Sequence, residues 1–151
     1  MKISDVIEWI QIADDDLYSA KTLNESVHKP YEIICYHCAQ AAEKYLKGYL
    51  AYNDIIPQKT HNLLFLHEIC FEKDNGFEVI RNECGLLNRF TNEIRYPHRI
   101  EIKEEDVNYS ISAVERIKNL ELIRKIRDVI SHGAISLLCI FSIGVYFYAI
   151  G

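Results

Sequence analysis

The sequence predicts an all-α protein, an antiparallel up-and-down bundle of four to five helices with an apolar C-terminal extension. Three observations predict this class. Apolar residues recur at three- and four-residue spacing over most of the chain, which is the period of one helix face. The 151 residues include only six Gly and three Pro, so long uninterrupted helices are plausible. No β-type alternation is convincing, apart from the short segment "RIEI".

The first three helices follow from their apolar stripes and their end signals. The first is expected over residues 3–23 and is amphipathic from its start. The second begins at Pro30, a residue that suits the first turn of a helix, and runs to about Tyr52. The third starts near Thr60–Asn62, where either end residue can act as an N-cap. The segment "EKDNG" then predicts a turn.

Two further helices complete the predicted bundle. The fourth takes residues 77–94 and must stop near Pro97. The fifth carries apolar residues over 107–120, and the acids of "KEED" suit its N-terminus. Short connections between all five elements favour an antiparallel arrangement.

The C-terminal segment differs from the rest of the chain. Residues 133–151 contain no charged side chain. This segment is barely long enough to form a membrane-spanning helix. A membrane anchor is one interpretation, and a buried or dimer-facing segment is the other. We therefore expect a helical domain over residues 1–125 and an atypical apolar segment over 126–151.

Composition limits the function classes. With 49% apolar and 26% charged residues, the chain resembles an average globular protein of one domain. Its formal net charge is -5, so any site for RNA or another anion must be a local patch. The odd number of Cys and the lack of an apolar leader indicate a reduced, cytoplasmic compartment.

The stretch "CYHCAQAAEKYLKGYL" places Cys35 and Cys38 at the spacing of a zinc knuckle. A structural zinc site needs four ligands, and no second C-x2-C pair is present. A redox pair would require a βαβ context, which is absent. The two thiols are therefore interpreted as small apolar residues on successive turns of a packed helix, and no metal or cofactor is predicted.

The other face of this helix carries Gln40, Glu43, Lys44 and Lys47. One interpretation is a solvated face with an ordinary i,i+4 pair between Glu43 and Lys47. The alternative is a functional face. On either interpretation we expect the ammonium groups to be exposed to water and the two thiols to be buried.

Four motifs resemble the HEPN family. The stretch above resembles its signature helix, which ends in Q-A-A-E-K-x-x-K, and "ADDDLYSAKTL" resembles its first helix. "PQKTHNLLFL" resembles its P-x-K-T-H-x-L segment, and "NEIRYPH" resembles its arginine-tyrosine-proline block. Together the four motifs span about residues 5 to 120.

This resemblance implies a helical bundle that pairs into a homodimer. In the branch with the arginine-tyrosine-proline block, it implies a nucleotide- or RNA-binding partner of a small nucleotidyltransferase, in a toxin–antitoxin type of module. Other branches are metal-independent endoribonucleases with an R-x4-6-H motif. A purely structural assembly subunit is a third possibility.

The nuclease alternative points to Arg127 and His132, which have R-x4-H spacing. Residues five apart on a straight helix lie about 140° apart, so the pair converges only if the helix ends or bends there. Gly133 makes such an end plausible.

The binding alternative points to other residues. Arg95, Tyr96 and His98 lie at the end of the fourth predicted helix, where an arginine suits a phosphate. Pairing of Arg95 with Asp16 would instead give it a structural role. Near the third helix start, Lys59 and His61 could hold an anion. With Lys44 and Lys47 from the signature helix, these residues complete the predicted ligand-binding set. His67 is expected at the surface or its boundary.

Overall fold

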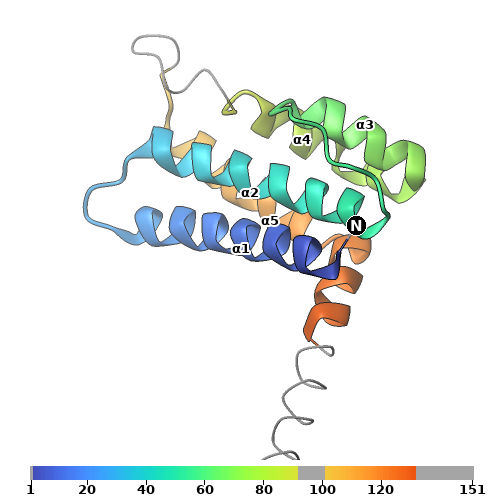
Figure 1. Ribbon diagram of the computed structural model, residues 1–151. Coiled ribbons are helices and arrows are strands. Elements are labelled where there is room, and N and C mark those ends of the chain that lie inside the picture. The colour runs from blue at the N-terminus through green and yellow to red at the C-terminus, as the bar shows by residue number, and fades with distance from the viewer. Residues whose placement is uncertain (1, 92–100, 132–151) are drawn as a thin grey trace, which may run out of the picture.

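The computed structural model describes residues 2–91 and 101–131, and these form a helical bundle (Figure 1). No strand occurs within those two ranges, so the all-α prediction is confirmed. The elements are α1 (Ile3–Glu25), α2 (Tyr31–Tyr52), α3 (Leu63–Lys73), a 3-10 helix η1 (Asn75–Ile80), α4 (Arg81–Asn88) and α5 (Glu104–Lys118). A further helical stretch covers residues 121–131.

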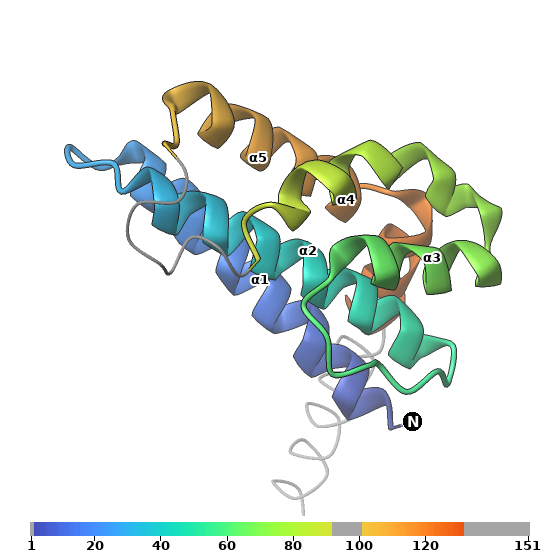
Figure 2. The same ribbon diagram turned by 90° about the horizontal axis from the view of Figure 1, so that it is seen from above.

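Helix α2 lies at the centre of the bundle. It runs antiparallel beside α1, and it also packs against α5, α3 and α4 (Figures 1 and 2). Most of its residues are buried, including small ones such as Cys38, Ala39, Ala41 and Ala42. A helix that is buried nearly all round is expected to carry many small and apolar residues, and this explains the cysteines and alanines of the signature stretch.

Helices α1 and α2 approach each other closely at Gly48. A Cβ built on this glycine would lie 2.9 Å from Cδ1 of Ile10 and 3.4 Å from the Cβ of Trp9. Ile10, Ala13, Leu17 and Ala20 form the buried face of α1 against this surface. The absence of a side chain at residue 48 thus lets the two longest helices approach.

The expected ends of α1 and α2 agree with the structure to within two residues, because the apolar stripes and Pro30 mark them. The third helix also starts as expected. The Oδ1 atom of Asn62 accepts a hydrogen bond from the backbone N of Phe65 at 3.1 Å, so Asn62 is the N-cap, and α3 ends at Lys73 within the predicted turn.

The fourth predicted helix is wrong over its first part. Residues 75–80 are a 3-10 helix instead of α-helix, and α4 ends at Asn88. The carboxylate of Asp74 accepts from the backbone N of Gly76 at 2.8 Å, and this local bond favours a tight 3-10 turn. Residues 92–94 of that prediction, and Pro97, lie outside the described ranges.

The fifth helix ends at Lys118 instead of continuing to residue 120. The backbone N of its cap, Asn119, donates to the carbonyl of Glu115 at 2.9 Å, and a second helical stretch then starts at residue 121. This stretch runs across the expected boundary between residues 125 and 126, and Ile126 is buried in the core.

His67 is fully buried instead of lying at the surface, because its Nε2–H donates to the carbonyl of Phe77 at 2.9 Å and joins α3 to η1.

Among the described helices, none combines the length and the apolar character that crossing a bilayer requires. The apolar segment 133–151 lies outside the described ranges, as does the "RI" of "RIEI", whereas Glu101 and Ile102 form no regular structure.

Candidate functional site

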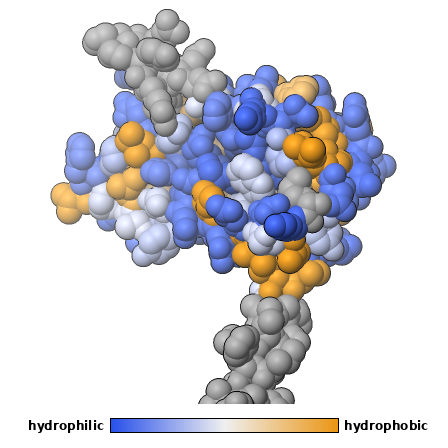
Figure 3. Space-filling model, viewed as in Figure 1, coloured by the Kyte–Doolittle hydropathy of each residue, from blue (hydrophilic) through white to orange (hydrophobic). Residues whose placement is uncertain are grey.

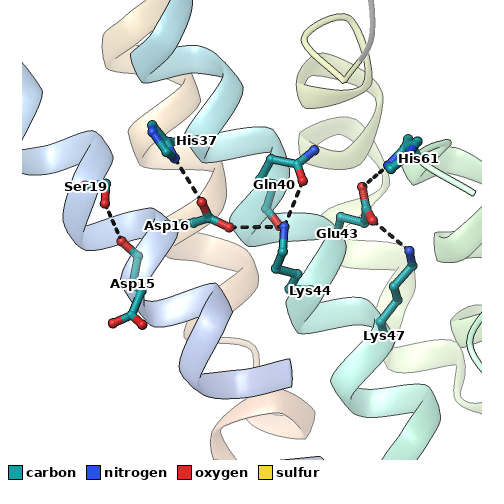
Figure 4. A network of polar contacts seen from close by, with 9 residues as sticks. All are labelled: Asp15, Asp16, Ser19, His37, Gln40, Glu43, Lys44, Lys47 and His61. Carbon is teal, nitrogen blue, oxygen red and sulfur yellow. Dashed lines mark hydrogen bonds and ion pairs between the residues drawn. The ribbon is translucent and has the colours of Figure 1, made fainter. Parts of the chain in front are cut away.

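A stripe of polar side chains runs along α2 on the face between α1 and α3 (Figure 4). His37, Gln40, Lys44 and Lys47 follow one another at three- and four-residue spacing, which places them on one side of the helix. Glu43 flanks the same stripe. The face of the molecule seen in Figure 3 is largely hydrophilic, with smaller hydrophobic areas between its charged side chains.

The first half of the stripe is organised by Asp16 of α1. Its Oδ1 lies 2.9 Å from Nδ1 of His37, and its Oδ2 lies 3.1 Å from Nζ of Lys44. The ammonium group of Lys44 also donates to Oε1 of Gln40 at 2.8 Å. One carboxylate therefore holds an imidazole and an ammonium group side by side.

The second half repeats this pattern around Glu43. Its Oε1 accepts from Nζ of Lys47 at 2.7 Å, and its Oε2 lies 3.0 Å from Nδ1 of His61. His61 comes from the segment before α3, and its side chain is 58% exposed. The Lys47 ammonium lies 5.5 Å from the ring centroid of Trp9, within cation–π range.

Both sets thus consist of a carboxylate that contacts the Nδ1 of a histidine with one oxygen and a lysine with the other. In each set the second ring nitrogen of the histidine points away from the carboxylate (Figure 4). A carboxylate on Nδ1 fixes the orientation of an imidazole ring. The stripe therefore holds two imidazole rings and two ammonium groups in fixed positions.

The prediction of water-exposed ammonium groups is wrong for this helix. Glu43 and Lys47 are buried, and the Lys44 side chain is only 15% exposed. The physical reason is that α1 and the segment before α3 cover the two sides of the stripe and bring Asp16 and His61 to it. The Glu43–Lys47 pair is consequently a buried ion pair and differs from an ordinary surface pair.

The thiols of this helix are buried as expected. Cys35 and Cys38 are fully buried and free. Burial raises the pKa of Cys35 to about 11, and it also raises the pKa of Cys38. Over the two described ranges, no group of three or more His, Cys, Asp or Glu side chains is placed to hold a metal ion.

The other predicted ligand-binding residues are only partly brought together. His61 joins Lys47 through Glu43, whereas Lys59 is exposed in the segment before α3. Arg95, Tyr96 and His98 lie outside the described ranges. Asp16 contacts His37 and Lys44, whereas Arg95, its alternative predicted partner, lies outside the described ranges.

Arg127 takes part in a separate cluster around Asp14. Its guanidinium lies 3.1 Å from Oδ2 of Asp14, while Oδ1 accepts from the Tyr45 hydroxyl at 2.6 Å and lies 3.0 Å from Nζ of Lys118. This cluster joins α1, α2, α5 and the stretch 121–131. His132 lies outside the described ranges, so the predicted Arg127–His132 pair stays a prediction.

The Asp14 cluster shifts two pKa values. Burial by itself would raise the pKa of Asp14, but the hydrogen bonds from Tyr45 and Lys118 and the charge of Arg127 outweigh it and leave this pKa lowered. Burial, together with the hydrogen bond to Asp14, raises the pKa of the Tyr45 hydroxyl. The cluster is therefore an ionised carboxylate that accepts from a neutral phenol.

Sequence reasoning missed three members of the polar stripe. Asp16 was considered only as a partner of Arg95, His37 was assigned to no binding site, and Glu43 was placed on a possible functional face without His61 as its partner. A usable signal was present in "ADDDLYSA", where Asp16 directly precedes the buried Leu17 and therefore lies beside the α1–α2 interface.

Comparison with known proteins gives one match. A family model described as the HEPN domain matches residues 6–126, a range that includes most of α1, all of α2 to α5 and the whole polar stripe. Neither the curated proteins nor the solved structures include a significant match to this sequence.

Proposed function

This chain belongs to the HEPN domain family, a nucleotide- or RNA-related class of helical domain, and from that premise we propose that its α2 stripe binds the phosphates of a nucleotide or RNA. The observation that carries the proposal is the repeated carboxylate–histidine–lysine set, Asp16–His37–Lys44 followed by Glu43–Lys47–His61.

The chemistry of the stripe fits phosphate oxygens. Ammonium and imidazolium N–H groups make short, charge-assisted hydrogen bonds to phosphate. The two carboxylates balance the two lysines, and the histidines add positive charge when they are protonated. His61 and His37 are the more exposed members, so they make the first contacts, with Lys44 next to them.

The carboxylates have a positioning role in this proposal. Asp16 and Glu43 hold each donor from the side opposite to the incoming phosphate, which reduces the side-chain entropy lost on binding. Because the chain carries a net charge of -5, affinity has to arise locally, and it should fall steeply with salt concentration.

The motif resemblance also supports a proposal for the wider biological role. We take the protein to act as a homodimer and as the partner of a small nucleotidyltransferase, in a toxin–antitoxin type of module. Support comes from the four motifs in register, above all "NEIRYPH". Copurification of a genomically adjacent small nucleotidyltransferase with the tagged protein would test this partnership.

The experiment for the site compares two lysines. Binding of a fluorescent single-stranded RNA and of ATP is measured for the wild type, Lys44→Gln and Lys125→Gln. We expect Lys44→Gln to weaken binding about tenfold, since one charge-assisted hydrogen bond is lost, and Lys125→Gln to bind as the wild type does. Lys125 is exposed and lies outside α2, in the stretch 121–131, where its ammonium group is 3.0 Å from Oε1 of Glu121.

Two results would contradict the proposal. One is a lack of binding by the wild-type protein at low salt, which would favour the structural assembly role. The other is an equal loss in both variants, which would indicate nonspecific attraction to surface charge.

A further inference from the structure

A groove of about 300 Å³ lies between α4 and α5, and it shares no residue with the α2 stripe. Its walls combine apolar and polar side chains from two helices. They are Asn82, Glu83 and Leu86 from α4, and Tyr109, Ser112, Ala113 and Arg116 from α5. This volume is at the lower end of the range for small-molecule sites.

Glu83 is the unusual member of this groove. Its side chain is 9% exposed, and its Oε1 contacts Nη1 of Arg116. The second oxygen, Oε2, is buried and accepts no hydrogen bond. A buried carboxylate oxygen without a donor is unfavourable, since its hydration has been lost without replacement.

Arg116 lines the groove beside Glu83 and contacts only one of the two carboxylate oxygens. The guanidinium side chain is 62% exposed, so it can move into solvent at little cost. A carboxylate is best satisfied by two parallel N–H donors from one planar group. The groove therefore has an anionic end that a better-shaped cation could occupy.

We propose that this groove binds a small organic cation with an amidinium or guanidinium group on an apolar or aromatic body. The planar cation donates to both carboxylate oxygens of Glu83 and displaces Arg116. Its body packs on Leu86 and Ala113, beside the ring of Tyr109, which is 64% exposed. This site is independent of the phosphate-binding stripe, so either proposal can fail without the other.

The test uses benzamidine as the probe and benzamide as the neutral control of the same shape. Amide chemical shifts of the full-length protein are followed by NMR up to about 10 mM ligand, the range expected for a fragment-sized molecule. We expect benzamidine to shift signals of residues 82–86 and 109–116 and benzamide to leave them unchanged.

Three variants distinguish a cation-binding groove from an ordinary surface salt bridge between Glu83 and Arg116. Glu83→Gln should weaken benzamidine binding about tenfold or more, because the charge-assisted bonds are lost. Arg116→Ala should strengthen binding several-fold, because the competing cation is gone. Arg81 lies on α4, as Glu83 does, but pairs with Glu68. The Arg81→Ala variant should therefore bind benzamidine as the wild type does.

Ser112→Leu gives a test that leaves Glu83 intact. Ser112 is exposed at the groove, so the larger side chain should fill the groove without disturbing the fold, and it should abolish binding. The proposal is overturned if benzamidine shifts no groove signals, if Glu83→Gln binds as well as the wild type, or if Arg116→Ala weakens binding.

Discussion

The ammonium nitrogen of Lys47 lies 2.7 Å from Oε1 of Glu43, and neither side chain is more than 7% exposed. His61 contacts the other carboxylate oxygen, and the Trp9 ring lies near the ammonium group. The pair is thus enclosed by α1 and by the segment before α3. A buried ion pair of this kind is destabilising to break, because one charge is then left without a partner.

Removing Lys47 should therefore destabilise the protein strongly. We expect Lys47→Met to lower the free energy of unfolding by about 3–5 kcal/mol, measured by urea denaturation. Lys125→Met is the matched control, because it breaks an i,i+4 pair with Glu121 that is about two-thirds exposed at both ends, and its effect should stay below about 0.5 kcal/mol. Equal effects of the two substitutions would show that burial of the Glu43–Lys47 pair has no energetic consequence.

Gly48 should show coupling with Ile10. Alone, Gly48→Ala should destabilise the protein by about 1 kcal/mol, because its Cβ would meet Cδ1 of Ile10. In an Ile10→Val background, that methyl group is gone, and Gly48→Ala should become stabilising through its higher helix propensity. A double-mutant cycle by thermal unfolding measures this. Additive effects would place the two residues out of contact.

Asp14 should contribute stability that depends on pH. Its pKa is lowered below the ordinary value of 3.8, so its contribution is fully present above that value and is lost as pH falls through the lowered pKa. Asp14→Asn should cost about 1–3 kcal/mol at neutral pH, and the difference from the wild type should shrink below about pH 4. A difference that stays constant down to pH 2 would argue against an ionised Asp14.

The described cysteines should resist thiol reagents in the folded protein. Burial raises the pKa of Cys35 to about 11 and that of Cys84 to about 12, and the thiolate is the reactive form. In a Cys139→Ser variant, which leaves only the four buried thiols, we expect labelling by a disulfide reagent at pH 8 to be slow. It should become fast and complete in denaturant. Rapid labelling of the native variant would contradict the burial of these thiols.

The sequence was sufficient for the helices whose signals are local. The stripe of α1 and the Pro30 that precedes α2 depend on neighbouring residues alone, and both helices were predicted closely. The 3-10 helix at residues 75–80 was missed, because the bond between Asp74 and Gly76 competes with helix geometry and leaves the apolar spacing unchanged.

The candidate site was predicted only in part, because burial of a polar face depends on distant segments. Lys44 and Lys47 were selected from the signature helix, but Asp16, which pairs with Lys44, and His61, which contacts Glu43, come from other segments of the chain. Asp16 lies 28 residues before Lys44 in sequence, and His61 lies 18 residues after Glu43. Periodicity places a side chain on a helix face and leaves open which segment covers that face.

The two histidine–lysine sets, His37 with Lys44 and His61 with Lys47, are the proposed site for nucleotide or RNA phosphates. The most direct measurement is NMR of the histidine side chains during titration with a short RNA, with signals assigned by His37→Asn and His61→Asn. We predict that the His37 and His61 signals move with RNA, while those of the exposed His28 and the buried His67 stay unchanged. Binding of RNA without any change at His37 and His61 would contradict the claim.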